Sequence, residues 1–105
     1  MLDCLFCKII AKEIPAEIFY EDEHVLVFPD IHPKAKTHFL IITKKHISSL
    51  LAIDESDNFI LGHLLKVTTI IADRLNIDGY RVQINVGKNG GQEIFHIHFH
   101  FLSNF

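Results

Sequence analysis

Hydrophobic and polar residues alternate near the end of the chain, where residues 95–102 read Phe-His-Ile-His-Phe-His-Phe-Leu. Successive side chains of a β-strand point to opposite faces. The pattern therefore predicts a strand with His96, His98 and His100 on one face and the aromatic and aliphatic side chains on the other. The apolar face suits a buried sheet. The imidazole face does not, because burial of polar rings carries a desolvation cost.

Other hydrophobic segments predict four further strands. Residues 18–20 and 25–28 are typical of a hairpin whose acidic turn is residues 21–24. Residues 39–43 form a continuous apolar run, which is typical of a central strand. Residues 80–85 alternate again and are expected to form an additional strand.

Apolar residues recur at spacings of three and four in the middle of the chain and predict one long helix: Phe59, Ile60, Leu64, Val67, Ile71 and Leu75. Asp54 or Ser56 is suited to cap its N-terminus, and Asn76 with Asp78-Gly79 to end it. Residues 4–11 read as a short amphipathic helix or turn. We therefore expect a single α+β domain over residues 1–105, with an antiparallel sheet of about five strands, one long helix and a short N-terminal helix.

Composition excludes several classes of protein. The net charge is −3 and the ten Lys and Arg residues are scattered, whereas a nucleic-acid-binding face needs clustered basic residues. No apolar stretch approaches the roughly 20 residues of a membrane span, and the first residues lack the features of a signal peptide. These observations predict a cytoplasmic protein that contacts neither nucleic acid nor membrane. In that compartment two cysteines indicate thiols or metal ligands rather than a disulfide.

The row of histidines indicates a functional role rather than a plain solvent-facing strand or an accident of composition. Its two functional explanations are metal binding and catalysis. His96 and His100 would lie about 13 Å apart along a strand, so both would bind the same tetrahedral zinc, with bonds near 2.0–2.1 Å, only under strain. Different roles for the three histidines are therefore expected.

Cys4 and Cys7 form a Cys-x-x-Cys hook that needs two more ligands to close a zinc site. His46, directly after the central strand, and His96 are suitable. The alternative explanation is two reduced, buried thiols. A zinc site built from these four residues would attach the N-terminal segment to the sheet.

Two loops offer polar groups for a ligand. Asp30 lies between Pro29 and Pro33, and it is either a turn residue or a carboxylate that accepts hydrogen bonds from ribose hydroxyls. Residues 85–93 hold three of the five glycines, so this segment is either a hairpin loop or a place where main-chain N–H groups face a phosphate. Several apolar side chains are either core or the walls of a slot for a base: Phe6, Ile9, Phe28 and Ile31.

These motifs together resemble the histidine triad (HIT) superfamily of nucleotide hydrolases and transferases. Residues 96–102 follow its His-φ-His-φ-His-φ-φ signature, where φ is hydrophobic. Similarity extends along nearly the whole chain: residues 4–10, 28–33 with 37–40, 44–47 and 90–92. The pattern is most similar to that of the Hint branch, the purine nucleoside phosphoramidases.

The resemblance assigns roles to the catalytic residues. His98 matches the nucleophile that attacks the α-phosphorus and forms a covalent nucleotidyl-histidine. His100 matches the residue that contacts the phosphate and passes a proton to the leaving group, and His38 matches a supporting histidine. A neutral imidazole is nucleophilic through one nitrogen when the other donates to a fixed acceptor, so this chemistry needs no catalytic cofactor.

The resemblance also implies how substrate is bound. Asp30 matches the carboxylate that holds the ribose, and Asn85 matches a polar side chain at the scissile end. Main-chain N–H groups near Gly91, Gln92 and Glu93 are expected to meet the charge that develops on the phosphate. The apolar walls around the base are implied to be Phe6, Ile9, Phe28, Ile31 and Leu40.

In zinc-carrying relatives the metal is bound by the residues that match Cys4, Cys7, His46 and His96, so a structural zinc is expected here. Family members are homodimers whose sheets join across a two-fold axis, so a homodimer is expected too. Two features depart from the family's usual pattern. Glu93 stands where many relatives have a small hydroxyl residue, and the sequence stops soon after the triad, at Phe105.

The sequence thus predicts a hydrolase of nucleoside 5′-phosphoramidates with a purine nucleotide as substrate. A dinucleoside polyphosphate hydrolase is the alternative within the superfamily, but it would need positive charge for the extra phosphates. A nucleotide-binding regulatory module with little turnover is a second alternative. A metal-dependent enzyme with the histidine row as ligands is a third.

Overall fold

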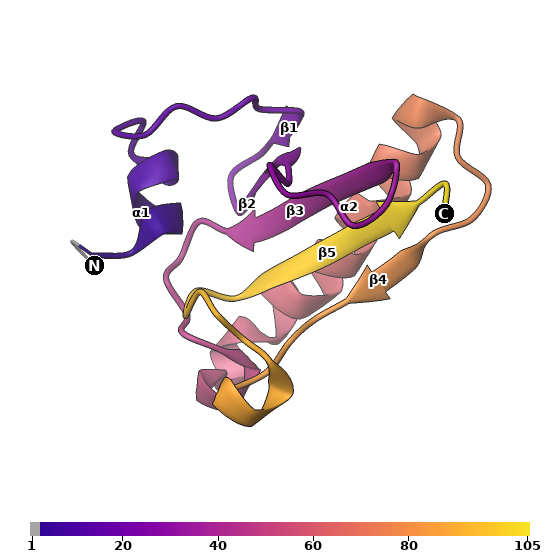
Figure 1. The fold of residues 1–105 in the computed structure, drawn as a ribbon. Helices are drawn as coiled ribbons and strands as arrows, with labels where there is room; N and C mark the ends of the chain where they lie inside the picture. Colours follow the sequence, from indigo (N-terminus) through magenta and orange to yellow (C-terminus); the bar gives the residue numbers. More distant parts are fainter. Residues whose placement is uncertain (1–2) are drawn as a thin grey trace.

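The computed structural model, which describes residues 3–105, contains a five-stranded antiparallel sheet with one long helix against it (Figure 1). The spatial order of the strands is β1-β2-β3-β5-β4. Their bounds are β1 Tyr20–Glu21, β2 Val25–Pro29, β3 Thr37–Thr43, β4 Arg81–Gln83 and β5 His98–Ser103. The helices are α1 Leu5–Ile10 and α2 Asn58–Leu75, with 3-10 turns η1 Leu50–Ala52, η2 Glu55–Asp57 and η3 Lys88–Gly90. The expected fold class is confirmed.

Alternation along the strands sends one set of apolar side chains toward α2. Phe99 and Phe101 of β5 pack there with side chains of β2 and β3. The buried face of α2 supplies Leu64, Val67 and Ile71 to the same cluster. This cluster is the main hydrophobic core, and it fixes the sheet on the helix.

The opposite set of strand side chains forms a second cluster beneath α1. Phe6 and Ile9 of α1 pack on side chains of β2 and β3, among them Leu40. In the pairing of β3 with β5, His100 lies opposite Leu40 and His98 lies opposite Ile42. Residues paired across neighbouring strands share a face. His98 and His100 therefore lie on the α1 face of the sheet.

The last strand is shorter than the alternation predicted. β5 begins at His98, and the segment before it bends, with the His96 N–H donating to the Ile94 carbonyl at 3.0 Å. Phe95 is 48% exposed instead of buried with the other aromatic residues. The bend turns this ring out of the sheet, so the predicted strand over residues 95–102 was too long at its start.

Other boundaries also shift. β1 is Tyr20–Glu21 instead of residues 18–20, and β4 covers only Arg81–Gln83 of the predicted strand over residues 80–85. Asp54 caps η2 through a capping box, and α2 follows directly. Asn76 ends α2 in the left-handed conformation that was expected of a C-terminal cap, with φ 54°.

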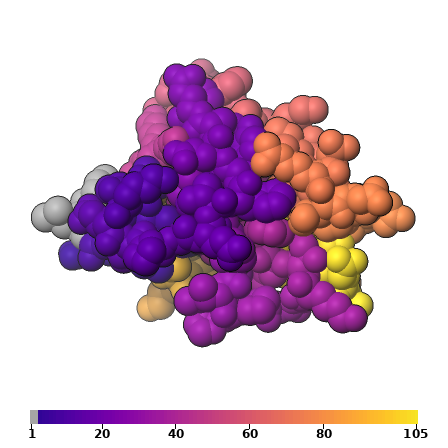
Figure 2. Space-filling view, turned by 90° about the horizontal axis from the view of Figure 1, so that it is seen from above, coloured from indigo at the N-terminus to yellow at the C-terminus, as the bar shows by residue number. Residues whose placement is uncertain are grey.

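The N-terminal helix and the segment that follows α2 lie at opposite ends of the molecule (Figure 2, indigo and orange). Across residues 3–105, every helix is too short or too polar to cross a membrane.

Candidate functional site

A cavity of about 560 Å³ opens on the α1 face of the sheet. One part of its wall is apolar: Leu5, Phe6, Ile9, Ile14, Pro15, Ala16, Phe28, Pro29, Ile31, Leu40 and Ile94. The other part is polar or flexible: Glu17, Asp30, His32, Lys34, Asn85, Gly91, Glu93, His98 and His100. The structure thus brings together most of the side chains that the sequence nominated. A cavity lined mainly by apolar side chains, with a small number of polar groups, is typical of a small-molecule site.

His98 is held in one tautomer by the main chain. Its Nδ1 lies 2.8 Å from the carbonyl oxygen of His96. A carbonyl only accepts, so Nδ1 carries the proton and the lone pair resides on Nε2. Burial lowers the pKa of His98, against the opposing effects of this hydrogen bond and of the Asp30 charge. The lowered pKa favours the neutral ring, which is the form that a nucleophile requires.

His100 lines the cavity beside His98, with ring centroids 5.1 Å apart. Its Nδ1 lies 2.9 Å from Nε2 of His38, which is buried behind the cavity wall. The Asp30 carboxylate reaches the same group, with Oδ2 3.4 Å from His38 Nε2. Burial, followed by the neighbouring imidazoles, lowers the pKa of His100 to about 4.

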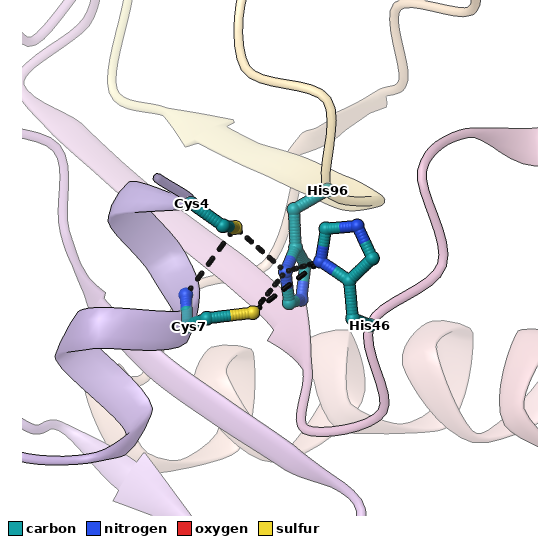
Figure 3. Close-up of side chains that lie close together, drawn as sticks. All are labelled: Cys4, Cys7, His46 and His96. Atoms are coloured by element: carbon teal, nitrogen blue, oxygen red, sulfur yellow. Dashed lines mark hydrogen bonds between the residues drawn. The ribbon is translucent and has the colours of Figure 1, made fainter. Parts of the chain in front are cut away.

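A cluster of two thiols and two imidazoles lies where the N-terminal segment meets the sheet (Figure 3). Cys4 Sγ and Cys7 Sγ lie 3.3 and 3.6 Å from His96 Nδ1. His46 Nδ1 lies 3.3 Å from Cys7 Sγ and 3.2 Å from His96 Nδ1. The sequence separates these residues by up to 92 positions, yet their four donor atoms all lie within 4.8 Å of one another.

This donor set fits zinc. Bonds near 2.3 Å to sulfur and 2.0–2.1 Å to nitrogen place neighbouring ligand atoms of a tetrahedron roughly 3.3–3.8 Å apart. His96 Nε2 donates to the Thr43 carbonyl at 2.6 Å, which leaves the lone pair of Nδ1 turned toward the cluster. Burial, as the first cause, lowers the pKa of His96 to about 4. A neutral imidazole with a fixed tautomer is the form that binds a metal.

The glycine-rich loop departs from the expectation. Gln92 is buried and does not line the cavity; its side chain holds the loop by contacts to Gly87 N, Ser48 O and Ile94 O. The Gly91 N–H donates to Lys88 O and the Gln92 N–H to Gly87 O. These two amides are therefore hydrogen-bonded within the loop. Gly91 and Glu93 themselves still border the cavity.

Sequence reasoning missed several groups of the site. Residues 14–17, after α1, contribute to the cavity wall, and the apolar run Ile14-Pro15-Ala16 was the available signal. The Lys34 N–H donates to His38 Nδ1 at 3.0 Å, and no sequence pattern marks that contact. The Thr43 carbonyl behind His96 is another such group.

Known proteins are similar to this chain along nearly its whole length. A family model described as scavenger mRNA decapping enzyme C-term binding matches residues 3–105. An uncharacterised HIT-like protein of Methanocaldococcus jannaschii is 46% identical over 104 residues, which cover 97% of this chain and 79% of that protein. A HIT family hydrolase of Legionella pneumophila superposes with a TM-score of 0.94 at 43% identity, over 98% of this chain and 94% of that one. A zinc-bound histidine triad family protein of Mycobacterium smegmatis superposes with a TM-score of 0.86 at 33% identity, over 99% and 76%.

Proposed function

The chain belongs to the histidine triad superfamily, and on this premise we propose that it hydrolyses nucleoside 5′-phosphoramidates and releases the nucleoside monophosphate. One observation carries the proposal. His98 borders the cavity with its Nδ1–H held by the His96 carbonyl, so its Nε2 lone pair is available as a nucleophile. The hydrolase named among the relatives supports this class of reaction.

The reaction proceeds in two displacements at phosphorus. His98 Nε2 forms a bond to the α-phosphorus as the phosphorus–nitrogen bond to the amine breaks, and the departing nitrogen leaves with a proton taken from solvent while His100 Nε2–H donates a hydrogen bond at the scissile end. Water then attacks the same phosphorus and loses a proton to solvent as the bond to His98 breaks. Each step is a single-bond exchange, and the covalent adduct divides one difficult displacement into two easier ones.

The apolar side chains that line the cavity suit the base of a nucleoside. Phe6, Ile9 and Phe28 offer a slot for a base. Asp30 also lines the cavity, where its carboxylate can accept hydrogen bonds from ribose hydroxyls. Its Oδ1 already accepts the His32 N–H at 2.8 Å, which fixes the side chain. A purine nucleotide offers an apolar base and polar ribose and phosphate groups to match this mixed lining.

The charges around the cavity favour an amine leaving group over additional phosphates. Among the described residues that line it, Lys34 is the one Lys or Arg, against the three carboxylates of Glu17, Asp30 and Glu93. A dinucleoside polyphosphate would bring several negative charges to this surface, at a Coulombic cost. Glu93 instead attracts a cationic amine.

We also propose a structural zinc at Cys4, Cys7, His46 and His96. The donor distances support it, and a relative is described as zinc-bound. Four protein ligands leave no open coordination position. Bound zinc therefore supplies stability to the junction of α1 with the sheet and takes no part in the reaction.

We propose that two copies of the chain form a homodimer. β4 forms one edge of the sheet, and all three of its residues are exposed. Large apolar side chains are exposed on β4 itself, with Val82 at 39%, and on α2, with Phe59 at 63% and Leu65 at 52% exposed. Pairing of two copies would cover an open strand edge, which proteins otherwise protect.

A turnover panel tests the function directly. Purified protein is given an adenylate–amine conjugate or a diadenosine polyphosphate, each with and without a chelator. We expect release of adenosine monophosphate from the conjugate, little from the polyphosphate, and no immediate loss of rate when chelator is added. Preference for the polyphosphate would favour the alternative hydrolase. Nucleotide binding without turnover would favour a regulatory module.

A further inference from the structure

His38 lies on β3 and is buried beneath the cavity. Both nitrogens of its ring have neighbours in the structure. Nδ1 lies 3.0 Å from the main-chain N–H of Lys34, while Nε2 lies 2.9 Å from His100 Nδ1 and 3.4 Å from Asp30 Oδ2. His38 is thus in contact with a loop amide, with a carboxylate and with a second imidazole.

These contacts allow one arrangement of protons for neutral rings. The Lys34 amide only donates, so His38 Nδ1 must accept and the His38 proton resides on Nε2. The Asp30 carboxylate favours a proton at that nitrogen for the same electrostatic reason. His38 Nε2 then donates to His100 Nδ1, which therefore bears the lone pair. The proton of His100 must consequently be on its Nε2.

His100 Nε2 is buried and has no hydrogen-bond partner among the described residues. A buried N–H group without an acceptor costs free energy, so such a group is unusual unless a ligand completes it. His100 also borders the cavity beside His98. Its Nε2–H is therefore available to a phosphoryl oxygen or to the leaving nitrogen.

We propose that His38 is a positioning residue: with the Lys34 amide on its far side, it holds His100 in the Nε2–H form that donates to substrate. This inference rests on the proposed function for the identity of the substrate, but the proton arrangement is a property of the free protein. A His100 ring with the opposite tautomer would direct a lone pair at the phosphate and repel it. His38 thereby determines whether the site attracts or repels the reacting group.

Nuclear magnetic resonance of protein with ¹⁵N-labelled histidine measures the arrangement directly. Long-range proton–nitrogen correlations identify which ring nitrogen of each histidine bears the proton. In the unsubstituted protein we expect protons on Nε2 of both His38 and His100. A proton on His100 Nδ1, or a His38 Nε2 without one, would overturn the proposal whatever reaction the protein catalyses.

Two variants then test the consequence. His38→Phe retains the ring volume but cannot donate, whereas an amide in His38→Gln can place an N–H near the position of Nε2. We expect His38→Phe to populate the second His100 tautomer and to lower kcat by up to about 10²-fold, as loss of one hydrogen bond to the transition state does. KM should change little, and His38→Gln should recover much of kcat. His24→Gln, a partly exposed histidine outside the cavity lining, serves as the control.

The outcomes distinguish the positioning role of His38 from the proposed function. If the expected tautomers are found but no phosphoramidate is cleaved, the proposed function fails and the positioning role of His38 survives. If His38→Phe leaves both the tautomer of His100 and kcat unchanged, the positioning role fails and the proposed function survives. Equal loss of kcat in the Phe and Gln variants, with unaltered tautomers, would also contradict the proposal.

Discussion

The ring of Phe6 lies edge-on to the ring of His98, with centroids 5.1 Å apart and the planes at 75°. Phe6 meets His96 in the same manner, at 5.7 Å and 83°. It stands between Cys4 and Cys7 in the sequence and is 1% exposed. The helix that, together with its N-cap Cys4, carries half of the proposed zinc site therefore also supports the proposed nucleophile.

Phe6→Ala should consequently lower both the stability of the protein and its affinity for substrate. Loss of a buried phenyl ring typically costs about 3–5 kcal/mol of unfolding free energy. Chemical denaturation measures that cost, and KM should rise because the same ring lines the cavity. Lys8→Ala, on the same helix but outside the cavity lining, should do neither. Unchanged stability of Phe6→Ala would contradict the supporting role.

Removal of one thiol should release the metal. In Cys7→Ser we expect zinc content, measured by elemental analysis, to fall from close to one atom per chain to a small fraction. The melting temperature should fall with it, since metal binding energy contributes to folding. Native protein purified without zinc that retains full activity and the same melting temperature would remove the basis for this site.

His98→Asn should reduce turnover by several orders of magnitude while nucleotide still binds, because the apolar slot and Asp30 remain intact. His100→Ala should lower turnover less, in keeping with loss of one donor, about 10²–10³-fold. Rapid quenching of the native reaction, followed by mass spectrometry, should find a nucleotidyl adduct on His98. An adduct on another residue would exclude the mechanism.

The lowered pKa of Asp22 predicts how the free energy of unfolding depends on pH. Its burial opposes ionisation, but hydrogen bonds from the His24 N–H, His63, the Tyr20 hydroxyl and the Val25 N–H together lower its pKa to about 2. A carboxyl with a depressed folded pKa stabilises the protein above its unfolded value, near 3.9, and loses that contribution as pH falls through the folded value. Stability should therefore decline between about pH 4 and pH 2.

Asp22→Asn should flatten that decline. It should also lower stability at neutral pH by roughly 1–3 kcal/mol, because His63 Nε2, 2.7 Å from Asp22 Oδ2, loses a charged acceptor. Denaturant titrations from pH 2 to pH 7 provide the measurement. The matched control is Glu23→Gln, whose side chain is 89% exposed. An identical acid decline in Asp22→Asn and the native protein would refute the assignment.

Val82→Asp should disrupt the proposed dimer, because it places a charge on the exposed edge strand β4. Sedimentation at low micromolar concentration should give about twice 12.1 kDa for the native protein and a single-chain mass for the variant. Ile18→Asp alters a partly exposed apolar residue beside the opposite edge of the sheet and should leave the dimer intact. A native protein that is monomeric and active would contradict us.

The sequence by itself determined the fold class and most of the cavity. Alternation in residues 95–102 placed His98 and His100 opposite Phe99 and Phe101, and the structure agrees. Periodicity located α2, and short motifs nominated both the cysteine–histidine cluster and Asp30. These features can be predicted because the sequence gives the type and the spacing of the side chains. The periods of strands and helices then determine which side chains share a face.

Tertiary structure decided the remainder. It bent the chain before His98, turned the Gln92 side chain into its loop, and paired His63 with Asp22, 41 positions away in the sequence. It also selected the tautomers of the histidines, through the carbonyls of Thr43 and His96 and the amide of Lys34. Every residue other than proline carries the same main-chain donor and acceptor. Sequence therefore cannot indicate which of them meets a given imidazole, and only the packed fold makes that choice.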